Sequence, residues 1–182
     1  MNIVIFGPPG AGKGTQADRL ASKYGLIHLS SGQLIRDEIA SGSHLGLAIE
    51  KIVRTGDLVP DDLTNDIVKR RMDKDDGRGF IFDGFPRTIF QAESLNRWLE
   101  DTGQTLSVTI NLRVNNDELV KRLLDRKRKD DDEIIIRHRL DVYEKETKLL
   151  IDFYHNQGVL LEIDGIGEIN TIYERIIKKL PQ

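Results

Sequence analysis

The sequence predicts an α/β fold built on a five-stranded parallel sheet with helices on both faces. Short apolar runs alternate with longer segments of helical periodicity, which is the pattern of parallel strands joined by right-handed helical crossovers. The first run, residues 3–6, is uninterrupted and rich in β-branched residues, as expected for a strand buried on both faces. Glycine or polar residues follow most of the runs directly. Because the carboxyl ends of parallel strands meet at one edge of the sheet, we expect a ligand to bind there.

The composition limits the classes of protein that remain. The chain has 182 residues, 38% of them hydrophobic, which fits one domain with a sizeable core. Lys and Arg total 27 against 30 Asp and Glu, so the net charge of −3 provides no broad basic face for nucleic acid. Cys is absent, which excludes a disulfide framework and a thiolate zinc site. No apolar run reaches the ~18 residues of a membrane span, and no signal-like segment precedes the first strand. We therefore expect a cytoplasmic protein that acts as a monomer.

The elements follow one another without repeats or long linkers. The predicted strands cover residues 3–6, 26–29, 80–82, 106–112 and 159–163. Predicted helices cover about 13–24, 31–40, 45–54, 61–72, 89–100, 116–124, 132–155 and 168–179. The helices within 30–59 form a small lobe inserted after the second strand, and 125–131 is a charged loop between two helices.

The stretch from Gly7 to Thr15 carries the strongest functional signal. It follows a strand and opens a helix, and its spacing Gly7-x4-Gly12-Lys13 fits the phosphate-binding P-loop. Glycines let the backbone N–H groups curl around a polyphosphate, the helix N-terminus adds a positive dipole end, and Lys13 adds an ammonium group. The hydroxyl comes at Thr15 rather than directly after Lys13, so the pattern does not establish direct magnesium ligation by this residue.

Several arginines and one aspartate occur at sequence positions that could complete a phosphate-binding site. Asp83 ends the third strand beside the P-loop, which resembles a Walker-B position. Six arginines stand out: Arg36, Arg87, Arg122, Arg126, Arg128 and Arg139. A phosphotransferase holds two anionic phosphates that repel by ~4 kcal/mol at ~4 Å and an effective dielectric of ~20, and arginines offset that repulsion. Arg122 and Arg126 are equally an ordinary i, i+4 surface pair. His28, within the second strand, is predicted to be a packed residue rather than a catalytic one.

These motifs together resemble the adenylate kinase family, over nearly the whole chain and in register. The segments that carry the resemblance are 7–16, Ser30-Ser-Gly-Gln-Leu-Ile-Arg36, 56–59, Phe82-Asp-Gly-Phe-Pro-Arg87 with Gln91, and Arg128-Lys-Asp-Asp131 with Arg139. The resemblance implies reversible phosphoryl transfer, ATP + AMP ⇌ 2 ADP, with Mg²⁺, and hence a role in adenine nucleotide homeostasis. It implies no covalent protein intermediate and no general base, because the AMP phosphate is already an anionic nucleophile.

The resemblance also assigns residues to subsites. The ATP site it implies consists of Gly10, Ala11, Gly12, Lys13, Gly14, Thr15, Arg122, Arg126 and Gly167. The AMP site it implies consists of Ser31, Arg36, Asp57, Leu58, Val59, Gly84, Phe85, Pro86, Arg87, Gln91, Arg128 and Arg139. The catalytic residues it implies are Lys13, Asp83, Arg87, Arg128 and Arg139. Asp83 would orient magnesium-bound water, and no protein side chain would ligate the metal directly.

The same resemblance divides the single kinase domain. The core would comprise 1–29, 60–124 and 132–182, the AMP-binding lobe 30–59, and a short lid 125–131. Longer lids in the family sometimes hold a cysteine zinc site, and we expect no structural zinc here. On pattern alone, the charge run from Lys127 to Glu133 is equally a solvated loop.

Three alternatives stay open at this stage. The first is a UMP/CMP kinase, against which Ser31 and Gln91 argue, since pyrimidine-specific relatives tend to carry Ala and Asn there. A P-loop switch protein of the GTPase class would be expected to show an Asn-Lys-x-Asp motif, which we do not find. A non-catalytic nucleotide-binding module would be expected to lose Lys13 or Arg87, and both are present.

Overall fold

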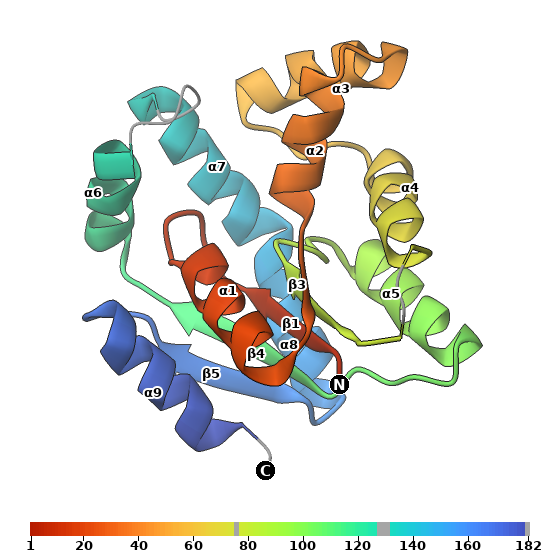
Figure 1. Cartoon of the computed structure of the whole chain (residues 1–182). Coiled ribbons are helices and arrows are strands. Elements are labelled where there is room, and N and C mark those ends of the chain that lie inside the picture. Colours follow the sequence, from red (N-terminus) through yellow and green to blue (C-terminus); the bar gives the residue numbers. More distant parts are fainter. Residues whose placement is uncertain (75–76, 127–131, 181–182) are drawn as a thin grey trace.

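The computed structural model describes residues 1–74, 77–126 and 132–180, and it contains the predicted five-stranded parallel sheet (Figure 1). The strands are β1 (Ile3–Phe6), β2 (Ile27–Ser30), β3 (Phe80–Asp83), β4 (Val108–Arg113) and β5 (Leu160–Asp164). Their order across the sheet is β2-β3-β1-β4-β5, so β1 lies at the centre between β3 and β4. The glycine-rich loop therefore leaves the middle of the sheet, and the end of β3 lies directly beside it.

The helices cover both faces, as predicted (Figure 1). They are α1 (Lys13–Tyr24), α2 (Ser31–Ala40), α3 (His44–Thr55), α4 (Asp61–Met72), α5 (Ile89–Asp101), α6 (Asn116–Arg126), α7 (Glu133–Lys145), α8 (Leu150–Asn156) and α9 (Ile169–Lys179), with a short 3₁₀ turn η1 (Thr147–Leu149). Alternate residues of β1 face opposite ways: Ile3 and Ile5 pack with α1 and α9, whereas Val4 and Phe6 pack with α5 and α8. This alternation divides the core into two layers.

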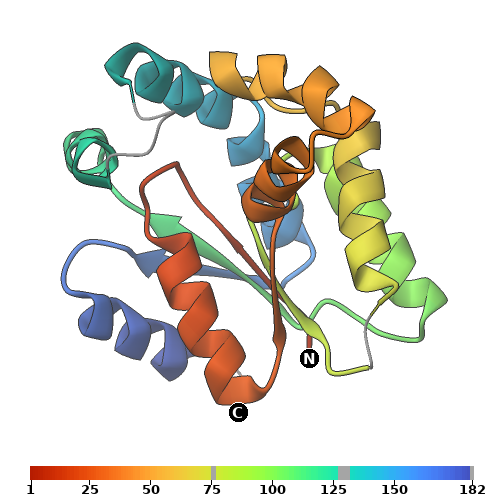
Figure 2. The same ribbon diagram turned by 45° about the horizontal axis from the view of Figure 1, so that its top comes forward.

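The helices α2 and α3 form a layer of their own with α4. Ile49, Val59 and Ile67 make a small buried cluster there, separate from the two clusters against the sheet. In Figure 1, α2 and α3 stand at the upper right and α6 and α7 at the upper left, above the sheet. Figure 2 shows the same arrangement with the top of the molecule turned forward.

One predicted helix is wrong in its continuity. The segment expected as a single helix over 132–155 is divided into α7, η1 and α8, with the break at Glu146, where φ is −108° and ψ −57°. Leu140 before the break packs on the α1 side of the sheet, and Leu150 and Tyr154 after it pack on the α5 side. One straight helix cannot bury its apolar stripe against both faces, so the chain bends between them.

Candidate active site

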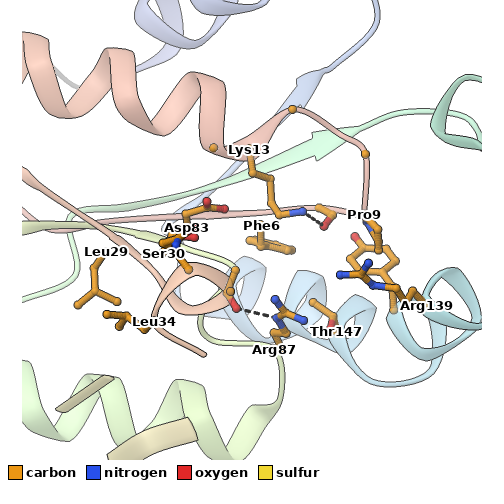
Figure 3. A pocket seen from close by; sticks show the side chains of 18 of the residues that line it. Phe6, Pro9, Lys13, Leu29, Ser30, Leu34, Asp83, Arg87, Arg139 and Thr147 are labelled. Atoms are coloured by element: carbon orange, nitrogen blue, oxygen red, sulfur yellow. Dashed lines mark hydrogen bonds between the residues drawn. The ribbon is translucent and has the colours of Figure 1, made fainter. Parts of the chain in front are cut away.

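A cavity of about 680 Å³ lies at the carboxyl edge of the sheet, where the sequence predicts a ligand (Figure 3). Thirteen of the predicted site residues line it: Gly10, Gly12, Lys13, Gly14, Thr15, Arg36, Leu58, Asp83, Gly84, Pro86, Arg87, Arg122 and Arg139. They come from the loop after β1 and the start of α1, from α2, from the loop after α3, from the end of β3 and the loop after it, and from α6 and α7. A cavity of this size falls in the usual range for small-molecule sites.

The glycine-rich loop is curled in the way a phosphate cradle requires. Gly7 approaches β4 so closely that a Cβ there would lie 2.6 Å from the Leu112 carbonyl oxygen. Gly12, with φ +89°, turns the chain into α1, which begins at Lys13. The Lys13 Nζ donates hydrogen bonds to the carbonyl oxygens of Gly7 and Pro8, at 2.9 and 3.0 Å. The Lys13 ammonium group is thus held over the glycine-rich loop, where a bound phosphate would lie.

The end of β3 and the start of α2 are tied together by one carbonyl group. The Gly84 carbonyl oxygen accepts from Ser31 Oγ at 2.6 Å. It also accepts from Arg87 Nε at 2.8 Å (Figure 3). A Cβ on Gly32 would lie 3.4 Å from Arg36 Nη1 and 3.8 Å from Arg87 Nη2. The two guanidinium groups therefore meet over the same glycine, although they come from different elements.

Arg139 of α7 brings a third positive charge to this point. Burial, together with the charges of Arg139 and Arg36, lowers the pKa of Arg87 from 12.5 to about 10, against the opposing effect of Asp83. Arg87 remains protonated at neutral pH. Like charges converge in this way where an anion binds between them.

Asp83 lies beside both the loop and a histidine. Burial alone would raise the pKa of Asp83, but the contact with His28 and the Lys13 charge lower it overall, so the carboxylate is ionised. His28 Nε2 is 3.4 Å from Asp83 Oδ2, and Nδ1 is 2.6 Å from Asp18 Oδ1. Although burial favours the neutral ring, these two carboxylates raise the pKa of His28. His28 and Asp18 line the cavity, which sequence reasoning missed. The signal in the sequence was a polar residue within an otherwise apolar strand.

The loop after α3 contacts α7 across the cavity. Asp57 Oδ1 is 2.6 Å from His138 Nε2, and the Asp57 pKa is lowered by that contact and by the Thr55 hydroxyl. A Cβ on Gly56 would lie 3.0 Å from Arg139 Cγ. The inserted lobe and α7 therefore close one side of the cavity together.

Arg122 of α6 lines the cavity and contacts the loop after β5. Arg122 Nε donates to Glu118 Oε1 at 2.7 Å, and its Nη1 donates to the Gly165 carbonyl oxygen at 3.1 Å. Arg122 thus belongs to the cavity wall and is not only a solvated surface charge. Gly167 lies in the same loop with φ +121°.

Several predicted site residues do not line the cavity, and Asp57 and Gly167 are among them. Ala11, Ser31, Val59, Phe85 and Gln91 are buried, each at most 5% exposed. Arg126 is the last residue of α6, and its side chain is not described. Arg128 and residues 127–131 of the predicted lid lie outside the described residues. Apart from His28 and Asp18, the lining residues that the sequence did not single out include Arg71, Val142, Tyr143 and Thr147.

None of the helices in 1–74, 77–126 and 132–180 combines the length and hydropathy of a membrane span. Within the same ranges, no group of three or more His, Cys, Asp or Glu side chains is arranged to hold a metal ion.

Comparison with known proteins gives one consistent family. The sequence model described as adenylate kinase matches residues 5–159. An adenylate kinase of Prochlorococcus marinus strain NATL2A is 47% identical over 178 residues, covering 98% of this chain and 97% of the relative. Adenylate kinases of Mycobacteroides abscessus and Thermobifida fusca are 45% and 44% identical, and each alignment covers 99% of this chain and 98–99% of the relative.

Proposed function

The chain belongs to the adenylate kinase family and is an ATP:AMP phosphotransferase, and we propose that its cavity holds both nucleotides with their phosphates meeting between Lys13 and Arg87. The products of the forward reaction are two ADP molecules. The relatives support this activity over the UMP/CMP kinase alternative. The residue assignments that follow are our proposal.

The convergence of Arg36, Arg87 and Arg139 opposite the glycine-rich loop is the observation that carries the proposal. Two phosphate groups approaching within ~4 Å repel by ~4 kcal/mol at an effective dielectric of ~20, so a phosphoryl transferase needs cations on both sides. Here Lys13 lies on one side and the three arginines on the other. Such preorganised charges also stabilise the charge that develops on the transferring phosphoryl group.

On the ATP side, we assign the phosphates to the backbone N–H groups of residues 10–15 and to Lys13. Lys13 would leave the carbonyl oxygens of Gly7 and Pro8 to follow the transferred group. Arg122 and Arg126 of α6 would contact the donor nucleotide, and the backbone at Gly167 would approach the adenine. The hydrogen bond from Arg122 to Gly165 supports this grouping, because it joins α6 to the loop that carries Gly167.

On the AMP side, we assign the phosphate to Arg36, Arg87 and Arg139, with Arg128 completing the set. The base and ribose would lie against Ser31, the backbone of residues 57–59, and residues 84–86. Gln91 would read the adenine edge. The Ser31 and Arg87 hydrogen bonds to Gly84 support a shared wall for this subsite.

The residues present fit a magnesium ion that ATP phosphates and water ligate. Asp83 is an ionised carboxylate with a side chain 12% exposed, and a Cβ on Gly14 of the loop would lie 3.4 Å from its Oδ2. One carboxylate suits contact through water, as Mg²⁺ usually keeps several waters in nucleotide sites. When bound, the ion would neutralise phosphate charge. Asp83 would orient its water shell, and Lys13 and the arginines would align the phosphates.

In the transfer we propose, an AMP phosphate oxygen attacks the γ-phosphorus of ATP and forms a new P–O bond. The bond between the γ-phosphorus and the β–γ bridging oxygen breaks, and ADP departs with that oxygen. The attacking oxygen is already anionic, so this chain needs no base to deprotonate it. Water would compete as acceptor in an open site, so the 30–59 lobe and the 125–131 lid must close before transfer. The division into this lobe, this lid and a core of 1–29, 60–124 and 132–182 is part of the proposal, as are a cytoplasmic location and a monomeric state.

A coupled assay with ATP against AMP, UMP, CMP and GMP tests the assignment. We expect AMP to be preferred by a wide margin in kcat/KM, and Lys13→Met to abolish turnover without unfolding the protein. Equal use of UMP or CMP would contradict the proposed AMP site.

A further inference from the structure

The carboxylate of Asp61 joins the starts of two helices. Asp61 is the first residue of α4, and its Oδ1 accepts a hydrogen bond from Gln91 Nε2 of α5 at 2.7 Å. Its Oδ2 accepts from the Thr88 hydroxyl at 2.8 Å, and that hydroxyl accepts from the Gln91 backbone N–H at 3.2 Å. Both carboxylate oxygens are thus engaged by the first turn of α5.

The opposite end of the Gln91 side chain is held as well. Gln91 Oε1 accepts from the Arg87 backbone N–H at 2.8 Å, and the residue is only 1% exposed. A carboxylate can only accept hydrogen bonds and a backbone N–H can only donate. A reversed carboxamide would place oxygen against carboxylate and NH₂ against N–H. One orientation alone therefore satisfies both neighbours.

We propose that Asp61 is a positioning residue that sets the base specificity of the AMP subsite by locking the orientation of the Gln91 carboxamide. This inference rests on the proposed function, which places Gln91 beside the acceptor base. After its bonds to Asp61 and Arg87, the carboxamide retains one N–H and one lone pair. These can form a bidentate pair with the edge of a purine.

The orientation decides which purine is accepted. Adenine presents an amino donor at position 6 and an acceptor at N1, whereas guanine presents an oxygen acceptor and an N1–H donor. With the base fixed by the rest of the site, a locked carboxamide complements only one of these patterns. A carboxamide that can turn over complements either. Buried polar groups left unpaired by the wrong base account for strong discrimination in such sites.

The chain offers a matched pair of substitutions. Asp61→Asn keeps the size of the side chain but adds a donor, so that position 61 no longer dictates the Gln91 orientation. Asp62→Asn removes the same charge from the same first turn of α4, at an exposed residue. Asp61→Glu retains the carboxylate and serves as the conservative variant.

The experiment measures kcat and KM for AMP and GMP at saturating ATP, with KM for ATP and the melting temperature of each variant. We expect Asp61→Asn to reduce the AMP-to-GMP ratio of kcat/KM by at least about 10-fold, the size of one charge-assisted hydrogen bond. The change should arise mainly in KM for AMP and leave KM for ATP within about twofold. Asp62→Asn should match the wild type, and Asp61→Glu should recover part of the loss. An unchanged ratio in folded Asp61→Asn overturns the inference.

A purely structural tie between α4 and α5 would lower the melting temperature and affect AMP and GMP alike, which would also overturn it. If Asp61→Asn does not fold, a through-hydrogen-bond scalar coupling between Gln91 Nε2 and Asp61 Cγ in the wild-type protein supports the lock, and its absence refutes it. Gln91→Ala distinguishes a failure of the base-reading role of Gln91 from a failure of the positioning role of Asp61. If Gln91→Ala also preserves the ratio, the base-reading role in the proposed function fails. If Gln91→Ala lowers the ratio and Asp61→Asn does not, only the role of Asp61 fails.

Discussion

Replacing Arg87 with methionine should leave the nucleotide-free protein as stable as the wild type or more stable, while nearly abolishing phosphoryl transfer. Methionine keeps the apolar stem and removes the guanidinium charge. That charge is unfavourable in the folded protein, because burial and the neighbouring Arg139 and Arg36 lower the pKa of Arg87 from 12.5 to about 10.

The magnitude follows from this change in pKa. A drop in pKa of about 2.5 corresponds to about 3.5 kcal/mol against the charged form, at about 1.4 kcal/mol for each pKa unit. Solvent screening at this partly exposed side chain reduces that figure. Loss of the hydrogen bond from Arg87 Nε to the Gly84 carbonyl oxygen reduces the expected gain in stability by about 1 kcal/mol more. We therefore expect the free energy of unfolding to change by between zero and about +2 kcal/mol.

Urea unfolding without nucleotide, together with steady-state turnover, checks both halves of this prediction. Turnover should fall by about 10³-fold or more, as for loss of a key electrostatic contact to the transition state. Inorganic phosphate should stabilise the wild type more than the variant, because the anion relieves the arginine repulsion. A loss of more than about 1 kcal/mol in stability would refute the view that Arg87 is held against repulsion. Near-normal turnover would refute its role in transfer.

Three further predictions concern other parts of the site. Lys13→Met should lower kcat by about 10³-fold or more with an unchanged melting temperature, and rapid turnover in that variant would exclude the proposed role. Because the folded pKa of His28 is raised above 6.5, its contacts contribute stability that is complete below pH 6.5 and is lost as the pH rises through the folded pKa. Urea unfolding of the wild type and His28→Gln should therefore give a difference in unfolding free energy that shrinks between about pH 5.5 and about pH 8.5. A difference that grows over this range would contradict the assigned contacts. If 125–131 is the proposed lid, Arg128→Ala should reduce kcat far more than stability, since a lid contributes little to folding, and EDTA should not change the melting temperature without nucleotide. Unfolding of Arg128→Ala with intact turnover per folded molecule would contradict the lid assignment.

Local patterns sufficed for the elements of this fold. The apolar run 3–6, the glycine spacing and Lys13 predict strand, loop and helix in order, because each depends on neighbours in the chain. They did not predict the break at Glu146. The apolar residues before and after Glu146 keep the same helical period. That periodicity does not show that the residues before the break and those after it pack against opposite faces of the sheet.

The residues of the candidate site also fall into those that local sequence patterns indicate and those that they do not. The sequence motifs identified Lys13, Asp83 and Arg87, and resemblance to a family supplied the remaining assignments. The hydrogen bond of Gln91 to Asp61 and the contact of His28 with Asp83 had no signal in the motifs, because each joins residues of different elements. His28 reaches Asp83 because β2 pairs with β3 in register, with Ser30 opposite Asp83.

The alternation of strands and helices, the phosphate-binding loop and the family can all be read from the amino-acid sequence. Each of these is encoded in short-range spacing, since backbone conformation and hydrophobic periodicity are local properties. The strand order β2-β3-β1-β4-β5 and the meeting of Arg36, Arg87 and Arg139 at one point depend on long-range packing, which the sequence pattern does not reveal. Those three residues lie on α2, on the loop after β3 and on α7. Their like charges come together because packing of the apolar faces fixes where each element ends, and that packing outweighs the repulsion between them.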